Sequence, residues 1–138
     1  MTGGVRSLGA IGWLLLFFGL AMLGNAGWML LDPGHWYTDL PAAVPDTGPY
    51  NAHFVRDIGC AFLTVGVALT WGAFSPRTRA PLTAVAALFL MAHALLHVYD
   101  TASGLLPSSH WELDFAGVYL PAIVVSAVAW ILWRREHA

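Results

Sequence analysis

The sequence predicts an all-α integral membrane protein, a four-helix bundle with up-down-up-down topology. Of the 138 residues, 58% are hydrophobic and only 10% are charged, whereas soluble domains carry about 25% charged residues. Four apolar runs are long enough to cross a hydrocarbon core, which takes about 20 helical residues. We expect one domain, 1–138, with spans at about residues 8–31, 51–74, 81–99 and 111–133.

The first two runs are joined by the longest connection. The run LGAIGWLLLFFGLAMLGNAGWMLL is predicted to be a retained span, because its apolar part exceeds the roughly 7–15 residues of a signal-peptide core. The loop of residues 32–50 carries the turn signals DPGHW and PDTGPY. The second run then opens with the polar stretch NAHFVRDIGC.

The last two runs are joined by shorter polar segments. SPRTRAP separates the second run from the third, and residues 100–110 separate the third from the fourth. Connections of this length favour antiparallel packing of consecutive helices. Pro121 predicts a kink in the fourth span, because proline removes a helical N–H group.

The arginines predict the orientation of the spans. Basic residues favour the cytoplasmic side of a membrane. Arg6 precedes the first span, Arg77 and Arg79 lie in the second loop, and Arg134 and Arg135 follow the fourth span. The first and third loops hold no Arg, and the sequence has no Lys. We therefore expect a bacterial inner-membrane protein with both termini inside and the first and third loops outside.

The ionisable residues gather at the predicted outer end, where five of the six His lie. His53 and Asp57 are four residues apart at the start of the second span, and His93 and His97 are four residues apart near the end of the third. Residues at this spacing share one face of a helix. Because these spans run in opposite directions, we expect His53 level with His97 and Asp57 level with His93.

These two faces predict a metal site that opens to the outside. Imidazole and carboxylate groups on facing helices of a bundle can converge on one transition-metal ion, here iron, copper or zinc. We therefore expect His53, Asp57, His93 and His97 to be metal ligands with a redox-linked role. The only cysteine is Cys60, which excludes a multi-cysteine site within one chain.

Further polar residues are predicted to surround this site. Asp100 would fix the tautomer of His97, and Arg56 would pair with Asp100 or Asp57, or hold an anionic group. His110 and Glu112 would close the site from above, and Asn25 would join it from the first span.

Three other uses of the same residues stay open. One His from the second span and one from the third would suit a b-type haem. A structural hydrogen-bond network would suit a non-enzymatic transport or assembly partner. An enzyme acting on a membrane lipid or quinone would use His53 or His97 as acid or base and Arg56 as an anion holder.

The expected partners follow from composition. The lipid bilayer is one, and a homo-oligomer or another membrane protein is a further candidate. Nucleic acid is excluded, because the chain has a net charge of −2 and no basic patch.

Two stretches carry a resemblance. GPYNAHFVRDIG and the later HALLHVYD resemble small four-span bacterial integral membrane proteins of unknown function. The likeness covers most of the chain in layout and these two stretches in residues. It implies the four-span membrane fold and assigns no catalytic role.

Overall fold

The computed structural model describes residues 8–138, which contain helices and no strand. Arg6 lies outside the described residues. Four long helices dominate: α1 (Ala10–Leu31), α3 (Ala52–Phe74), α4 (Arg79–Ala102) and a fourth that ends as α6 (Leu120–Glu136). The short elements are α2 (Pro33–Asp39), the 3-10 helix η1 (Val44–Thr47), α5 (His110–Leu113) and the π-helix η2 (Phe115–Tyr119).

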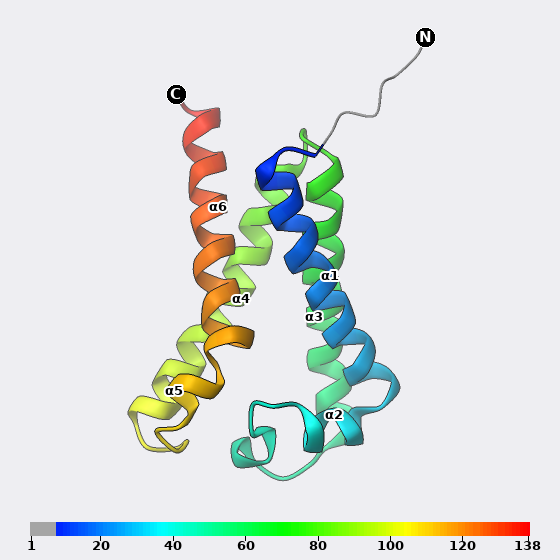
Figure 1. The fold of residues 1–138 in the computed structure, drawn as a ribbon, viewed down its shortest axis with the longest axis vertical. Helices are drawn as coiled ribbons and strands as arrows, with labels where there is room; N and C mark the ends of the chain where they lie inside the picture. The colour runs from blue at the N-terminus through cyan, green and yellow to red at the C-terminus, as the bar shows by residue number, and fades with distance from the viewer. Residues whose placement is uncertain (1–7) are drawn as a thin grey trace.

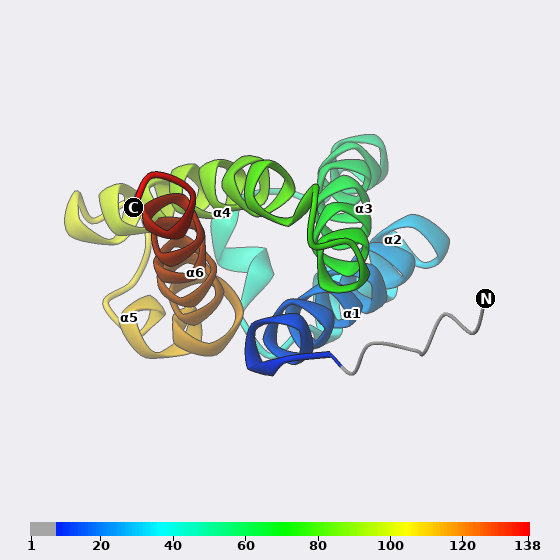
Figure 2. The same ribbon diagram turned by 90° about the horizontal axis from the view of Figure 1, so that it is seen from above.

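The long helices pack as two pairs, α1 with α3 and α4 with α6, and α3 also packs against α4 (Figure 1). One end of the molecule carries α2, η1 and α5, and we call it the loop end. The opposite end carries the α3–α4 connection and the C-terminus, and we call it the arginine end. Seen along the helices, the segment that contains η1 lies across the loop end, between the two pairs (Figure 2).

The prediction of four long apolar helices is confirmed. Residues 10–31, 52–74, 79–102 and 115–136 are each long and apolar enough to cross a membrane. The third helix is longer at both ends than the predicted 81–99. The apolar side chains of each helix divide into a buried stripe and a broad exposed face, and the buried stripes form one core along the two pairs.

Glycines allow close packing of α1 against α3. A Cβ atom at Gly66 would lie 2.8 Å from Cγ and 2.9 Å from the backbone nitrogen of Leu23. A Cβ atom at Gly19 would overlap the hydroxyl of Thr70. Small residues at such positions let two helical backbones approach each other, so this pair is the tightest contact in the fold.

Arg79 closes the arginine end of α3. Its Nε donates to the carbonyl oxygen of Gly72 and its Nη2 to that of Ala73, both at 2.8 Å. The last carbonyls of a helix have no partner within the helix, and a basic side chain near that end is a favourable partner. One guanidinium therefore fixes the short turn between α3 and α4.

The fourth helix starts later than predicted. Residues 110–113 form the separate helix α5, and the continuous apolar helix begins at Phe115 rather than near Trp111. The amides of Val118 and Tyr119 both donate to the carbonyl oxygen of Asp114, at 2.8 and 3.2 Å. This widened π turn precedes Pro121, whose ring would crowd a carbonyl in a regular helix. The π turn lies just before Pro121, the residue at which the sequence predicts a kink.

Candidate functional site

The carboxylate of Asp114 joins two histidines at the loop end. Its Oδ2 lies 2.8 Å from Nδ1 of His97, on α4, and 3.2 Å from Nδ1 of His110, on α5. The side chain of Asp114 is 2% exposed and that of His110 is fully buried. Buried polar groups are costly unless they are paired, so these contacts hold α5 against α4.

A fourth group extends this set toward the surface. Nε2 of His110 lies 3.3 Å from Oδ2 of Asp46, which belongs to η1. Asp46 is 42% exposed, so it is the member most open to solvent. Asp46, His110, Asp114 and His97 thus alternate carboxylate and imidazole, and we call these four residues the His–Asp row.

The local sequence explains how His110 and Asp114 meet. They are four residues apart on one helical turn, which places their side chains on the same face. The amide of Asp114 donates to the carbonyl of His110 at 3.1 Å, completing that turn. The turn itself begins after Pro107, whose carbonyl accepts from the amide of His110.

His93 lies one turn deeper than His97, and its contacts are aromatic. The two imidazole centroids are 4.7 Å apart. The ring of Phe62, from α3, stands perpendicular to His93 at 5.6 Å, and the ring of Phe89 lies parallel to it at 5.9 Å. His93 and His97 therefore form an imidazole pair, and its deeper member, His93, contacts a phenyl ring of α3 and one of α4.

The contact with Asp114 determines which nitrogen of His97 is free to react. When Nδ1–H donates to the carboxylate, Nε2 carries the lone pair and has no partner on Asp114. A carboxylate on one imidazole nitrogen fixes the tautomer and orients the other nitrogen for acid–base chemistry or ligation. His97 is 17% exposed, so it is neither sealed in the core nor free in solvent.

The four predicted metal ligands divide into two pairs. Nε2 of His53 lies 3.3 Å from Oδ2 of Asp57, and these side chains are 86% and 59% exposed. His93 and His97 contact each other on α4. Among residues 8–138, no group of three or more His, Cys, Asp or Glu is arranged to hold a metal ion.

The expected level of Asp57 with His93 differs from the structure. Phe62, five residues deeper than Asp57, packs against His93 instead. Only residues 75–78 separate α3 from α4, and positions equally far from this turn lie side by side. Iron, copper, zinc and b-type haem stay predictions, and metal analysis and a Soret spectrum of the purified protein would test them.

The predicted surrounding residues take different roles. Nε of Arg56 donates to the carbonyl of Leu30 at 3.3 Å and so ties α3 to α1. Oδ1 of Asn25 accepts from the indole of Trp36 at 2.8 Å and so ties α1 to α2. Both contacts position elements of the loop end.

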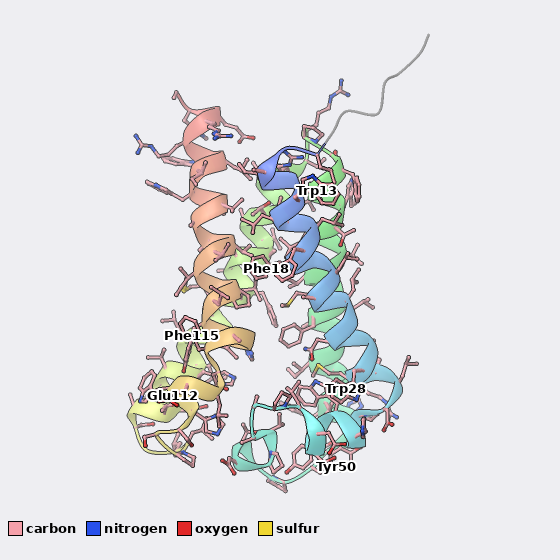
Figure 3. All side chains as sticks on the ribbon, viewed as in Figure 1. Trp13, Phe18, Trp28, Tyr50, Glu112 and Phe115 are labelled. Carbon is pink, nitrogen blue, oxygen red and sulfur yellow. The ribbon has the colours of Figure 1, made fainter. Side chains whose placement is uncertain are left out.

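The acidic candidates also separate from one another. His97 contacts Asp114 rather than Asp100, and Asp100 accepts from the amides of Leu105 and Leu106 through its carbonyl. Glu112 is exposed on α5 (Figure 3). Of the five surrounding candidates, His110 joins the imidazole pair through Asp114.

The sequence analysis did not identify Asp114 or Asp46 as members of the site. His110 and Asp114 have the same spacing as His53 and Asp57, and that signal would have identified Asp114. A carboxylate at the start of a helix is also accounted for by the helix dipole alone. Asp46 had no signal, because 64 positions separate it from His110.

A second His–Asp contact at the loop end stands apart from the row. Nε2 of His35 lies 2.7 Å from Oδ2 of Asp39, and Nδ1 of His35 accepts from the indole of Trp28 at 3.0 Å. Both side chains of the ion pair are more than half exposed. This pair therefore provides a matched control for the buried row.

Comparisons with known protein families, with curated proteins and with solved structures find no match to this chain. Function is therefore inferred from the residues at the loop end.

Proposed function

We propose that this chain is a multi-pass protein of the bacterial inner membrane, with an outward-facing acid–base site for a ligand of the quinone class. Exposed apolar side chains support the membrane assignment: Trp13, Phe17 and Leu20 on α1 are 60%, 65% and 56% exposed. Such faces are costly in water and suit hydrocarbon. Aromatic residues lie toward both ends, Trp13 at one and Trp28 and Tyr50 at the other (Figure 3), as in proteins that meet both membrane interfaces.

The charge distribution supports the orientation. Arg77 and Arg79, beside the α3–α4 connection, and Arg134 and Arg135, near the C-terminus, belong to the arginine end. The positive-inside rule assigns this end to the cytoplasm. The loop end then faces outside, with both termini inside and four spans in up-down-up-down order.

One observation carries the proposed chemistry, the 2.8 Å contact between Asp114 and Nδ1 of His97. A buried carboxylate at this nitrogen leaves Nε2 of His97 to take or give a proton at a ligand oxygen. Positioned imidazoles are the most common general acids and bases in enzymes. In this proposal His97 exchanges the proton, and Asp114 positions it.

The surroundings of the imidazole pair favour a planar ligand with a polar oxygen. Phe62 and Phe89 present aromatic rings at right angles and in parallel to His93, and aromatic rings attract one another in both arrangements. A quinol ring offers the same stacking, a hydroxyl for His97 and an apolar tail for the bilayer. A lipid headgroup shares the protonatable oxygen and lacks the ring.

The burial of His110 and Asp114 favours a second candidate, a purely structural network in an assembly or transport partner. Such a network would stabilise the loop end without binding a small molecule. The two candidates differ in quinol binding, which only the acid–base site requires.

Equilibrium binding separates these candidates. Purified protein in nanodiscs of synthetic phosphatidylcholine would be titrated with decylubiquinol. We expect saturable binding by the wild type and by His53→Gln, and at least about tenfold weaker binding by His97→Gln, because the imidazole that Asp114 orients toward the ligand oxygen is lost. Equal binding by wild type and His97→Gln, with both folded, would refute the site.

The same preparations distinguish a quinone from a lipid. Organic extraction followed by mass spectrometry would identify molecules that remain with the protein through purification in mild detergent. A quinone retained by the wild type and reduced in His97→Gln would support the proposal. A stoichiometric lipid with that dependence, without decylubiquinol binding, would replace the quinone by a lipid.

A further inference from the structure

We propose that the His–Asp row is a proton path between outer water and His97, with Asp46 as its solvent-exposed end. This inference rests on the proposed function, since it names the route by which the acid–base site exchanges its proton with water. It gives Asp46 and His110 roles that the proposed function does not assign.

The distances permit a proton to pass along the whole row. The steps are 3.3 Å from Asp46 to Nε2 of His110, 3.2 Å from its Nδ1 to Asp114, and 2.8 Å from Asp114 to Nδ1 of His97. N–H···O hydrogen bonds typically span 2.7–3.2 Å, so the second and third steps lie within this range and the first lies just above it. Every step joins a carboxylate oxygen to a ring nitrogen.

Burial makes Asp46 the most exposed end of the path. Asp46 is 42% exposed, whereas His110 is fully buried and Asp114 is 2% exposed. A proton entering from water therefore meets Asp46 first, and the middle of the row is shielded from solvent. Histidine and acidic residues in series are a recurring form of proton relay in membrane proteins.

The proton balance closes at every step. Nε2 of His97 takes a proton from the ligand oxygen, and Nδ1 of His97 releases its own proton to Asp114. Asp114 passes this proton to Nδ1 of His110, Nε2 of His110 releases its proton to Asp46, and Asp46 releases a proton to water. Each imidazole gains one proton and loses one, and turning of the rings restores the starting tautomers. The reverse sequence, starting from the tautomers that this passage leaves, carries a proton inward.

The loop that carries Asp46 is held in place by its own hydrogen bonds. The hydroxyl of Tyr37 donates to the carbonyl of Gly48 at 2.6 Å, and the hydroxyl of Thr47 donates to the carbonyl of Val44 at 2.7 Å. These contacts frame Asp46 on both sides in sequence. Asp46 is therefore positioned by the fold of the loop as well as by His110.

The two imidazoles of the row have different neighbours. His97 contacts Asp114 and the ring of His93, and His110 contacts Asp46 and Asp114. His93 is thus the other titratable group beside the inner end of the row. The test must therefore resolve His97 from His93.

The test measures exchange of the His97 ring N–H with water, by nitrogen-15 NMR of histidine-labelled protein in nanodiscs. Asp46→Asn keeps the shape of the side chain and cannot carry the proton. We expect exchange at His97 to slow by at least about tenfold, since positioned acids and bases typically accelerate proton transfer by roughly 100- to 10,000-fold. Asp46→Glu should retain most of the rate.

Asp39→Asn is the matched control, because Asp39 is also an acidic residue of the first loop that contacts a histidine outside the row. It should leave exchange at His97 unchanged. Equal exchange in wild type and Asp46→Asn, or equal slowing in both Asn variants, would overturn the path. No ligand is needed, so failure of this test is separate from failure of quinol binding.

Discussion

Oδ2 of Asp114 lies 3.2 Å from Nδ1 of His110, one helical turn away, and neither side chain has appreciable contact with solvent. The same carboxylate contacts His97 on a different helix. One buried acidic group thus positions the short helix α5, the start of the fourth long helix and the imidazole pair on α4.

Replacing Asp114 by Ala should destabilise the protein strongly. His97 and His110 would each lose a partner, and unpaired buried polar groups cost about 1–3 kcal/mol apiece. We expect a loss of about 3 kcal/mol in the free energy of unfolding, seen as a lower midpoint in a denaturant titration in detergent. Asp57→Ala is the control and should change stability little, because that side chain is 59% exposed. Equal effects would contradict a structural role for the row.

Arg79→Ala should weaken the turn between α3 and α4. Two carbonyls at the end of α3 would lose a charged donor, which is expected to cost about 1–2 kcal/mol. Arg77→Ala removes the same charge from an exposed position of the same turn and should have a smaller effect. Thermal unfolding of both variants in one detergent checks this, and a larger effect at Arg77 would be inconsistent with the cap.

Gly66→Ala should separate α1 from α3. The added methyl would lie 2.9 Å from the backbone nitrogen of Leu23, and overpacking of this kind costs about 1–3 kcal/mol. Gly24→Ala is the control, because no atom lies within 4 Å of a Cβ atom at that position. Thermal unfolding should show a loss of stability for Gly66→Ala alone. If both variants unfold like the wild type, the close packing of α1 against α3 at Gly66 is wrong.

The proposed orientation predicts which loop reacts with an impermeant thiol reagent in intact cells. In a Cys60→Ser background, Thr47→Cys should be labelled from outside, because residue 47 lies at the loop end. Arg77→Cys should be labelled only after the membrane is opened. The opposite pattern would place the loop end in the cytoplasm and remove the proposed access from outer water.

The four long helices could be predicted from sequence because length and hydropathy alone determine them. The start of the fourth helix could not, since the π turn before Pro121 depends on how Asp114 accepts two amides. Hydropathy also does not predict the short helices α2 and η1, which lie in the first loop at the loop end.

The candidate site was predicted only in part, for a geometric reason. Spacing showed that His93 and His97 share a face of α4, which the structure bears out. Spacing within one helix says nothing of rotation relative to the next helix, so it could not show that Phe62 rather than Asp57 meets His93. The contact of Asp46 with His110 depends on the path of a loop, which no helical period describes.

The proposed function requires His97 to exchange a proton with a quinone-class ligand. The most direct measurement is the nitrogen-15 chemical shift of the histidine rings during a decylubiquinol titration in nanodiscs. We expect saturable shifts at His97 and His93 and none at the exposed His53. Shifts absent from His97 at saturating decylubiquinol, or no larger there than at His53, would contradict it.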